Sequence, residues 1–570
     1  MATMPQVPPP PPPPPGPPPP PSSGPRAEHI YPTLTPAQLG RIAAHGRRGR
    51  VEAGEVLVQA GEQTARLFVV VAGRIDVVRP SAAGDEVVVE FGPGMFTGEV
   101  TMLSGRPGLA QIRAGAAGEV IEVGRDELLA LIQSDGELSE ILMRAFILRR
   151  VELIARGISD VVVLGSAHCQ GTLRIRAFLT RNGHPHTMLD LDRHAGVQEL
   201  LDRFHVSAAD VPVVITCGEV VLRNPSNQQI ADALGFNDAI DQTQVRDLVI
   251  VGAGPSGLAA AVYGASEGLD VLVVESTAPG GQAGSSSRIE NYLGFPMGIS
   301  GQELAGRAYT QAEKFGAQVI IGKGATRLAC DRKPYALELG DGQRLPARSV
   351  IIASGAEYRR LPIDNLPQFE GAGVYYAATF MEAQLCAGEE VIVVGAGNSA
   401  GQAAVFLAQA ARRVHMLIRS GGLADTMSRY LIRRIEEHPA IVRHVQTEIV
   451  TLEGNGHLER VGWRDNHSER TETHAIRHVF AMTGAVPSTR WLAGCLALDA
   501  KGFIKTGPDL SPEDLATARW PLGRAPHLLE TSLPGVFAIG DVRARSLKRV
   551  ASAVGEGSIA IAAVHQVLHE

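Results

Sequence analysis

Asp247-Leu-Val-Ile-Val-Gly252-Ala-Gly254-Pro-Ser-Gly257 is the stretch of this sequence that decides the fold. An apolar run ends in closely spaced glycines, and small residues follow them. This order predicts a buried strand, a tight turn and a helix, so that backbone amides and the helix N-terminus can approach a pyrophosphate closely. The stretch therefore predicts a dinucleotide-binding βαβ unit.

A second stretch of the same kind follows downstream, Val391-Ile-Val-Val-Gly395-Ala-Gly397-Asn-Ser-Ala400. One match alone is weak evidence, because a glycine-rich strand-turn-helix is often only tight packing. Two matches in one chain indicate a protein that holds two dinucleotides and passes a hydride between them.

Charged residues stand where the neighbouring strands should end. The apolar run Val271–Val274 ends in Glu275, about 20 residues past the first glycines, where a carboxylate accepts the ribose hydroxyls of an adenosine. Near the C-terminus, another apolar run ends in Gly540-Asp541. After the second glycine stretch, His415–Ile418 ends in Arg419, where an NAD site would carry an acid. A cation suits a 2′-phosphate, so NADPH is favoured over NADH.

Residues 246–570 resemble bacterial thioredoxin reductase over their whole length. The resemblance implies FAD and NADPH as cofactors, hydride transfer from NADPH to the flavin, a homodimer, and hinges near Gly371–Val374 and Gly484–Thr489. By motif, the implied FAD positions are Gly252, Gly254, Gly257, Glu275, Gly281, Gln282, Asn291, Gly540, Asp541, Arg549 and Val550. The implied NADPH positions are Gly395, Gly397, Ser399, Ala400 and Arg419.

The sequence departs from this family at its redox centre. In Gly373-Val-Tyr-Tyr-Ala377-Ala-Thr-Phe380 the family carries a C-x-x-C that takes electrons from the flavin, and both cysteines are replaced here, by Ala377 and Phe380. Cys386 follows alone, and a lone thiol cannot cycle as an internal disulfide. The family's second 2′-phosphate arginine is Ser420. We therefore expect that the internal dithiol chemistry does not run in this chain.

Residues 32–156 predict a small jelly-roll barrel of short strands flanked by helices. Gly54–Glu62, Phe68–Val77 and Phe96–Pro107 resemble the cyclic nucleotide-binding domain family, which places Gly98 and Glu99 at the nucleotide. The family's phosphate-binding arginine is Gly108 here. Either Arg106 or Arg113 substitutes for it, or the barrel is a scaffold that has lost its ligand, since a buried phosphate without a cation is costly. The expected elements are a helix over Thr35–His45, strands over Glu55–Gln59, Arg66–Ala72, Arg74–Val78, Glu86–Phe91 and Glu119–Val123, and a helix over Leu138–Ile154.

Residues 158–240 predict the order β-α-β-α-β-β-α, which resembles the thioredoxin/glutaredoxin fold. Val211-Pro212 stands where that family carries a cis-proline, and Cys169-Gln170-Gly171-Thr172 would be its active turn, with Thr172 in place of the resolving cysteine. A helix N-terminus lowers the pKa of a thiol, so Cys169 is a candidate reactive monothiol that His168 could assist. The alternative is a docking domain with an idle cysteine. The expected helices include Val197–Phe204.

Composition excludes several classes of protein. The chain has 53 Lys and Arg against 60 Asp and Glu, a formal net charge of −7, which argues against a nucleic-acid binder. No stretch approaches the roughly 20 apolar residues of a membrane span, and no secretory signal is evident. The proline run Pro8–Pro21 predicts a stiff, solvated tail. The cysteines are far apart, which predicts no disulfide framework, no metal site and a cytoplasmic location. They are Cys169, Cys217, Cys330, Cys386 and Cys495.

The sequence thus predicts a multidomain α/β chain with two Rossmann-like domains, preceded by a jelly-roll barrel and a thioredoxin-like domain. The predicted function is an NADPH-dependent FAD oxidoreductase with an unidentified acceptor, either a redox protein or a small molecule. The alternatives are a thiol-disulfide reductase working through Cys169, and a cyclic-nucleotide or redox sensor with little turnover. The predicted domains are a tail over 1–28, the barrel over 32–156, the thioredoxin-like domain over 158–240, the FAD domain over 246–370 and 489–570, and the NADPH domain over 371–488.

Overall fold

A computed structural model describes most of the chain. The described residues divide into two compact units, one drawn from those up to 158 and the other from those from 159 onward, with Glu62 and Met102 grouped with the second. The described residues are 25–59, 62, 66–79, 86–98, 102, 110–155, 161–166, 169–191, 207, 210–216, 220–286, 288–376, 378, 380–424, 427–492 and 494–570.

The first unit contains an antiparallel sheet of five strands in the order β1-β5-β3-β4, with β2 pairing β5. Its inward side chains, among them Phe68 and Ile75, form an apolar core. The bounds are β1 (Arg47–Val51), β2 (Val56–Val58), β3 (Arg66–Arg79), β4 (Glu86–Phe91) and β5 (Gln111–Gly124), with helices α1 (Pro25–Ile30), α2 (Pro36–Ala43), α4 (Arg125–Ser134) and α5 (Gly136–Ala155).

One prediction for this sheet is wrong, and one strand was missed. The strands expected over Arg66–Ala72 and Arg74–Val78 are one strand, β3, because Gly73 only shifts the register of pairing with β5. At Gly73, with φ of +87°, a Cβ would lie 2.6 Å from the Ala117 carbonyl oxygen, so the glycine permits close strand contact. Strand β1 was not predicted, because four of its five residues are exposed and polar or glycine.

The segment from Val161 to Ala233 forms a four-stranded sheet in the order β7-β6-β8-β9, with β6 and β7 parallel and the other pairs antiparallel. The Val211-Pro212 peptide bond is cis, as predicted. The helix predicted over Val197–Phe204 lies outside the described residues. The bounds are β6 (Val161–Gly165), α6 (Gln170–Arg181), β7 (Thr187–Asp190), β8 (Val213–Thr216), β9 (Val220–Arg223) and α8 (Asn227–Ala233).

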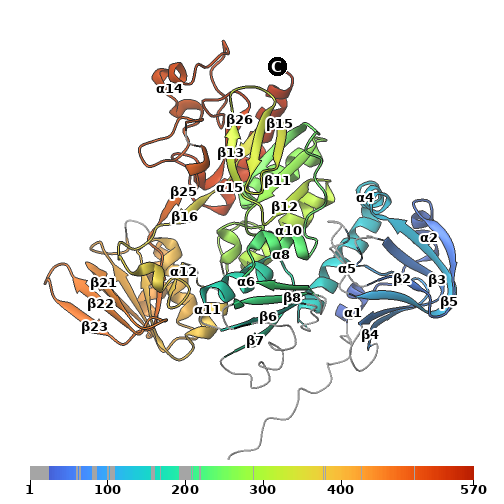
Figure 1. The fold of residues 1–570 in the computed structure, drawn as a ribbon, viewed down its shortest axis with the longest axis horizontal. Coiled ribbons are helices and arrows are strands. Elements are labelled where there is room, and N and C mark those ends of the chain that lie inside the picture. Colours follow the sequence, from blue (N-terminus) through green and yellow to red (C-terminus); the bar gives the residue numbers. More distant parts are fainter. Residues whose placement is uncertain are drawn as a thin grey trace, which may run out of the picture. The chain divides into compact units, whose positions relative to one another are not determined.

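The first glycine stretch opens a seven-stranded sheet in the order β12-β11-β10-β15-β14-β13, with β26 pairing β15 (Figure 1). Its β10, β11, β12, β15 and β26 are parallel. The segments of β10 and β15 that pair with each other are apolar, Leu248–Val251 and Val350–Ile352, as expected for strands covered on both faces. The bounds are β10 (Arg246–Val251), α9 (Pro255–Ser266), β11 (Val271–Glu275), α10 (Gly301–Lys314), β12 (Gln318–Ile321), β13 (Ala325–Ala329), β14 (Tyr335–Leu339), β15 (Arg344–Ile352), α14 (Pro512–Thr517), β26 (Val536–Ala538) and α15 (Val550–Leu568).

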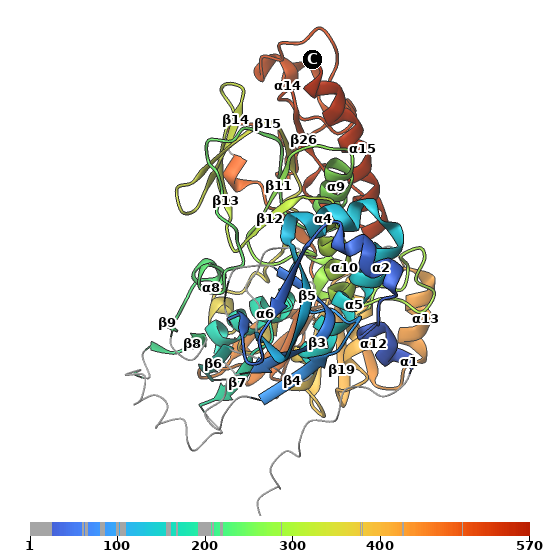
Figure 2. The same ribbon diagram turned by 90° about the vertical axis from the view of Figure 1, so that its right-hand side faces the viewer.

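Helix α15 corrects the expectation that no segment reaches the length of a membrane span. Within the described part of the chain it is the one helix long and apolar enough to cross a membrane by length and composition. Core helices of soluble proteins pass the same test, so this is weak evidence. Here α15 runs beside α9 (Figure 2), and its Ala560, Ile561 and Val564 are fully buried in the core that both helices share.

The second glycine stretch opens a five-stranded parallel sheet in the order β17-β24-β18-β19-β20, beside an antiparallel sheet of β21, β22 and β23. The bounds are β17 (Val374–Tyr375), α11 (Phe380–Leu385), β18 (Glu390–Val394), α12 (Asn398–Leu407), β19 (Arg413–Ile418), α13 (Arg429–Glu437), β20 (Ile441–Val445), β21 (Thr447–Glu453), β22 (Arg460–Asp465), β23 (Thr471–His474) and β24 (His478–Ala481).

A two-stranded ribbon joins the two dinucleotide-binding sheets. Strand β16 (Ala356–Tyr358) pairs antiparallel with β25 (Ala485–Pro487). The second predicted hinge, Gly484–Thr489, overlaps β25, whereas the first, Gly371–Val374, lies further along the chain than β16.

The structure also contains a disulfide, which contradicts the expectation of none. The sulfur atoms of Cys330 and Cys495 are bonded across 165 residues of chain. The two cysteines lie before and after the second glycine stretch, and both side chains pack against one apolar core beside β13. No local pattern indicates this pairing, because it depends on the return of the chain to the first sheet.

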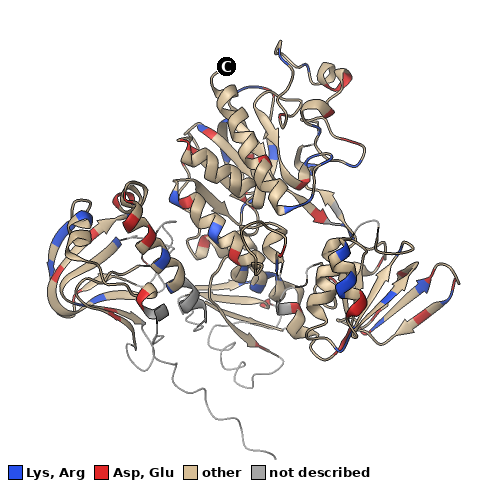
Figure 3. Cartoon of the chain, turned by 180° about the vertical axis from the view of Figure 1, so that it is seen from behind, with Lys and Arg blue, Asp and Glu red and all other residues tan. Residues whose placement is uncertain are grey.

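Charges of both signs are interspersed over the described elements (Figure 3). This distribution agrees with the small formal net charge of −7.

Candidate functional site

The glycines of the first turn have two roles: two of them permit close backbone contacts, and one leaves open space for a ligand. Gly252 has φ of +105°, and a Cβ there would lie 2.3 Å from the Ala353 carbonyl oxygen. A Cβ on Gly257 would lie 1.9 Å from the Gly252 carbonyl oxygen. At Gly254, in contrast, a Cβ would meet only the Gly281 Cα, at 3.9 Å. The space above Gly254 fits a pyrophosphate at the N-terminus of α9.

Glu275 lies beside this turn, at the end of β11. Its buried carboxylate accepts hydrogen bonds from the backbone N–H groups of Ala253, Thr277 and Ala278, at 2.8, 2.8 and 3.2 Å. The predicted contact with a ribose would therefore use the remaining lone pairs of an acid that also fixes the glycine turn.

Asp541 lies in a turn next to the same helix. Burial raises the pKa of Asp541, and its side chain accepts no hydrogen bond from the described residues. A half-buried carboxylate without a protein donor fits a ligand that brings hydroxyl groups. A Cβ on the preceding Gly540, with φ of +71°, would lie 2.5 Å from the Ser256 Oγ atom, so η6 (Gly540–Val542) contacts the first turn of α9.

The sequence interpretation missed Glu556. Its carboxylate accepts a hydrogen bond from the Gly540 N–H at 2.6 Å and pairs with Arg543 at 2.6 Å. This acid therefore orients the turn that carries Asp541. The sequence signal that could have found Glu556 is its place between Gly555 and Gly557. A glycine at 557 marks a close contact between helices, since a Cβ there would lie 2.6 Å from the Ser256 carbonyl oxygen.

Of the remaining predicted FAD positions, some lie near the first glycine turn and one has no contact with it among the described residues. Gly281 lies against Gly254, and Gln282 donates a hydrogen bond to the Ala356 carbonyl in the connecting ribbon at 3.1 Å. Arg549 and Val550 stand at the start of α15. Asn291 is exposed in a loop, and no contact within the described residues ties it to the glycine turn.

The second glycine turn repeats the pattern of the first. Gly395 has φ of +141°, and a Cβ there would lie 2.4 Å from the Met482 carbonyl oxygen. At Gly397 a Cβ would meet nothing within 4 Å, which leaves the space that a pyrophosphate needs. Ala400 is fully buried in α12, Ser399 is exposed, and Arg419 is exposed directly after β19. These residues fit the adenosine half of NADPH.

Cys169 stands at the N-cap position of α6. The residue is half-buried, and its sulfur accepts no hydrogen bond from the backbone N–H groups of the first turn. A Cβ on Gly171 would lie 3.0 Å from Pro212 Cγ, so the cis-proline packs on the turn as predicted. Thr172 is fully buried, and its hydroxyl has no hydrogen-bond partner among the described residues. His168 lies outside the described residues.

Helix α6 connects this turn with the first glycine site. At its start, Gln170 Cγ would lie 3.2 Å from a Cβ on Gly371. At its end, Arg181 donates to the Gly281 carbonyl at 2.9 Å and Asn182 donates to the Thr277 carbonyl at 3.1 Å. A helix of 12 residues is about 18 Å long, so Cys169 and Gly281 lie at opposite ends of it.

The positions of the family's dithiol give no side-chain geometry, because Ala377 and the side chain of Phe380 lie outside the described residues. Cys386 is fully buried, and burial raises its pKa to about 11. It is therefore a protonated thiol without access to solvent. Among the described residues, no group of three or more His, Cys, Asp and Glu could hold a metal ion.

The predicted nucleotide site of the barrel is only partly described. The Gly98 carbonyl accepts a hydrogen bond from the buried Arg149 at 2.9 Å, which leaves Gly98 in a structural role. Glu99, Arg106 and Gly108 lie outside the described residues.

A histidine cluster includes His415 on β19, the strand that directly precedes Arg419. The ring nitrogens of His415 and His444 approach to 3.0 Å, and both rings pack on Trp463 at 5.5 and 5.1 Å between centroids. His474 stacks on Trp463 with 3.7 Å between ring centroids, and Glu390 Oε2 lies 3.3 Å from His415 Nε2. This cluster joins the parallel sheet to the antiparallel one.

We expect this cluster to make the domain less stable in acid. Burial lowers the pKa of His415 and of His444 from the ordinary value of 6.5, so the unfolded chain binds protons more tightly than the folded one. Stability should therefore fall as the pH drops from about 6.5 towards the lowered pKa values. Thermal unfolding followed by tryptophan fluorescence between about pH 7.5 and pH 5.5 measures the effect.

The control is a double variant, His415→Asn with His444→Gln, which keeps polar groups but removes the titration. Its unfolding midpoint should vary less with pH than that of the wild type. An equal loss of stability in acid for both proteins would contradict the assignment to this cluster.

Comparisons with known proteins agree with these two glycine sites. Residues 246–557 match the family model described as Pyridine nucleotide-disulphide oxidoreductase, and residues 48–135 match the one described as Cyclic nucleotide-binding domain. The thioredoxin reductase of Bacillus subtilis is 30% identical over 331 residues, which cover 58% of this chain and 97% of that protein. The thioredoxin reductase of Ureaplasma parvum is 33% identical over 320 residues, which cover 56% of this chain and 95% of that protein.

Solved structures give the same result. The thioredoxin reductase of Lactococcus lactis in its FR conformation matches with a TM-score of 0.51 and 25% identity, over 57% of this chain and 100% of that chain. The thioredoxin reductase of T. acidophilum matches with a TM-score of 0.50 and 26% identity, over 57% of this chain and 99% of that chain.

Proposed function

The chain belongs to the pyridine nucleotide-disulphide oxidoreductase family, as a thioredoxin reductase-like protein with an N-terminal cyclic nucleotide-binding domain, and we propose that it reduces an external acceptor without an internal dithiol. Proteins of the thioredoxin reductase family bind FAD and use NADPH, and these are the cofactors of this chain. The observation that carries the proposal is the replacement of both dithiol cysteines, by Ala377 and Phe380, in a chain that keeps both glycine sites.

Bound FAD would supply the two-electron chemistry, and the residues of the chain bind and orient the two cofactors. The space above Gly254 and the carboxylate of Asp541 hold the flavin nucleotide, and the space above Gly397 holds NADPH. The N-terminus of α15, at Arg549 and Val550, would stabilise the negative charge of the reduced flavin. No side chain needs to act as a general acid or base for a hydride to pass between two aligned rings.

The acceptor is a redox protein or a small molecule that the flavin meets directly. The loss of both dithiol cysteines supports direct transfer, because no internal disulfide then stands between the flavin and the acceptor. The protein is expected to act as a homodimer, as the resemblance implies, and in the cytoplasm, as the cysteine spacing predicts.

We expect Cys169→Ser to leave turnover unchanged with every acceptor that reacts at the flavin. NADPH oxidation is followed with a quinone, oxygen, a ferredoxin-like protein and a disulfide, and Cys169→Ala serves as a second variant that has no hydroxyl. Wild-type rates in both variants support direct transfer. A loss confined to the disulfide acceptor would establish instead the thiol-disulfide function, which the turn beside Pro212 favours.

The third function, a sensor with little turnover, is favoured by the match to the cyclic nucleotide-binding domain. It predicts a flavin that NADPH reduces and that no acceptor reoxidises quickly. A thermal-shift titration with cyclic AMP and cyclic GMP tests the ligand, since a compound that binds only the folded state raises the melting temperature. No shift at millimolar nucleotide would leave the barrel as a scaffold.

A further inference from the structure

The NADPH site lacks one of the cations that its family resemblance implies. Ser420 stands at the second arginine position, directly after Arg419. Its hydroxyl donates a hydrogen bond to the Gly422 carbonyl at 3.0 Å, so it caps its own loop. A 2′-phosphate carries up to two negative charges, and Arg419 alone would leave it partly unpaired.

The start of α13 is fixed beside the second glycine turn. The Ser428 N–H donates a hydrogen bond to Asn398 Oδ1 at 2.9 Å, and Asn398 directly follows Gly397. A Cβ on Gly401 in α12 would lie 2.5 Å from Leu431 Cδ2 and 2.8 Å from Met427 Cε. The first turns of α12 and α13 are therefore in close contact, and Arg429 is the first residue of α13.

The segment that carries Arg419 is hydrogen-bonded to the same turn. The Gly395 N–H donates a hydrogen bond to the Leu417 carbonyl at 3.0 Å, and Arg419 follows two residues later. Two backbone hydrogen bonds therefore hold the segments of both arginines at the turn between Gly395 and Asn398. One is made by Leu417, two residues before Arg419, and the other by Ser428, directly before Arg429.

The charges around α13 leave Arg429 available. Arg434 pairs with Glu290 at 3.1 Å, and Arg443 pairs with Glu436 at 2.7 Å. Arg419 and Arg429 are exposed, and neither makes an ion pair or hydrogen bond with the part of the chain that the structure describes. An arginine fork matches phosphate geometry, and a phosphate is also favoured near the N-terminus of a helix.

We propose that Arg429 is the second cation that binds the 2′-phosphate of NADPH, and that it determines the preference for NADPH over NADH together with Arg419. This inference rests on the proposed function, because it assumes that NADPH binds at the second glycine turn. It assigns to α13 the positive charge that the sequence lost at Ser420.

Calorimetric titration of the oxidised holoenzyme tests the proposal without turnover. The ligands are NADP⁺, NAD⁺ and 2′,5′-ADP, which carries the 2′-phosphate without the nicotinamide. Arg429→Ala should weaken NADP⁺ and 2′,5′-ADP by about five- to tenfold and leave NAD⁺ unchanged. Arg429→Lys should fall between the two, because it keeps the charge and loses the fork.

Arg433→Ala is the matched control, since Arg433 lies one turn further along α13 and is also free of partners among the described residues. This variant should keep the wild-type ratio of NADP⁺ to NAD⁺ affinity. The proposal is overturned if Arg429→Ala keeps that ratio, or if Arg433→Ala changes it equally. A wild-type holoenzyme that binds neither dinucleotide would overturn the proposed function itself, whereas equal binding of both would overturn only the role of Arg429.

Discussion

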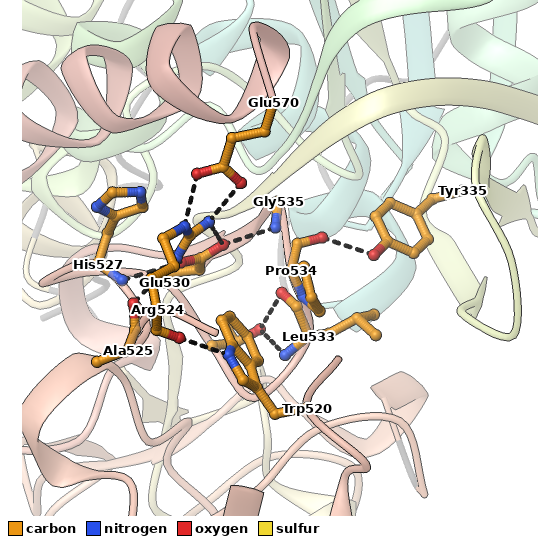
Figure 4. A network of polar contacts seen from close by, with 11 residues as sticks. Tyr335, Trp520, Arg524, Ala525, His527, Glu530, Leu533, Pro534, Gly535 and Glu570 are labelled. Atoms are coloured by element: carbon orange, nitrogen blue, oxygen red, sulfur yellow. Dashed lines mark hydrogen bonds and ion pairs between the residues drawn. The ribbon is translucent and has the colours of Figure 1, made fainter. Parts of the chain in front are cut away.

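Replacing Arg524 by alanine is expected to destabilise the flavin-binding domain by about 3–5 kcal/mol, because it leaves a buried carboxylate unpaired. The side chain of Glu530 is fully buried, and Arg524 pairs with it at 2.7 Å (Figure 4). Glu530 also accepts hydrogen bonds from the backbone N–H groups of His527 and Gly535, at 2.9 and 2.8 Å. Gly535 directly precedes β26, the strand that leads to Asp541.

The temperature at which FAD is released on heating measures this loss in the full chain. Glu570→Gln is the matched control, because Glu570 binds the outer side of the same guanidinium, at 2.6 and 2.9 Å, and is exposed (Figure 4). An exposed pair of this kind contributes roughly 0–1 kcal/mol. If Glu570→Gln lowered the release temperature as much as Arg524→Ala, burial of Glu530 would not be the source of the effect.

Replacing Gly254 by alanine is expected to weaken FAD binding strongly in a chain that still folds. A Cβ there meets only Gly281 Cα, at 3.9 Å, and φ is −72°, so the polypeptide accepts the methyl group. The methyl group would occupy the space of the pyrophosphate. Overpacking costs about 1–3 kcal/mol, which corresponds to roughly 5- to 150-fold in affinity.

Reconstitution of the apoprotein with FAD, followed by flavin fluorescence, measures the affinity, and circular dichroism reports the fold. Gly397→Ala is the matched control, because it adds the same methyl group at the second turn, where a Cβ meets nothing within 4 Å. That variant should bind FAD normally and lose NADP⁺. Normal FAD affinity in Gly254→Ala would show that the pyrophosphate does not lie on this turn.

The features that the sequence predicted are those set by local pattern. Strand β4 (Glu86–Phe91) has the bounds that its apolar run predicts. The glycine turns at Gly252 and Gly395 have the positive φ that a tight strand-to-helix turn requires. Asp541 lies in η6, shortly after the apolar strand β26, as the apolar run before it predicted.

The features that the sequence did not predict depend on contacts between distant segments. Glu556 acts on Gly540 only after α15 has packed on α9, and Asn398 meets Ser428 only because α12 and α13 lie side by side. The disulfide of Cys330 likewise requires the chain to return from the NADPH-binding sheet. The strand β1 lacks an apolar alternation, since its stability comes from pairing with β5.

Anaerobic titration of the purified full-length protein with NADPH, followed by visible absorption, tests the central claim most directly. The account predicts a yellow protein whose flavin absorption is bleached by NADPH at close to stoichiometric amounts, in wild type and in Cys169→Ser alike. A protein that stays colourless after reconstitution with FAD, or a bound flavin that excess NADPH leaves oxidised, would contradict it.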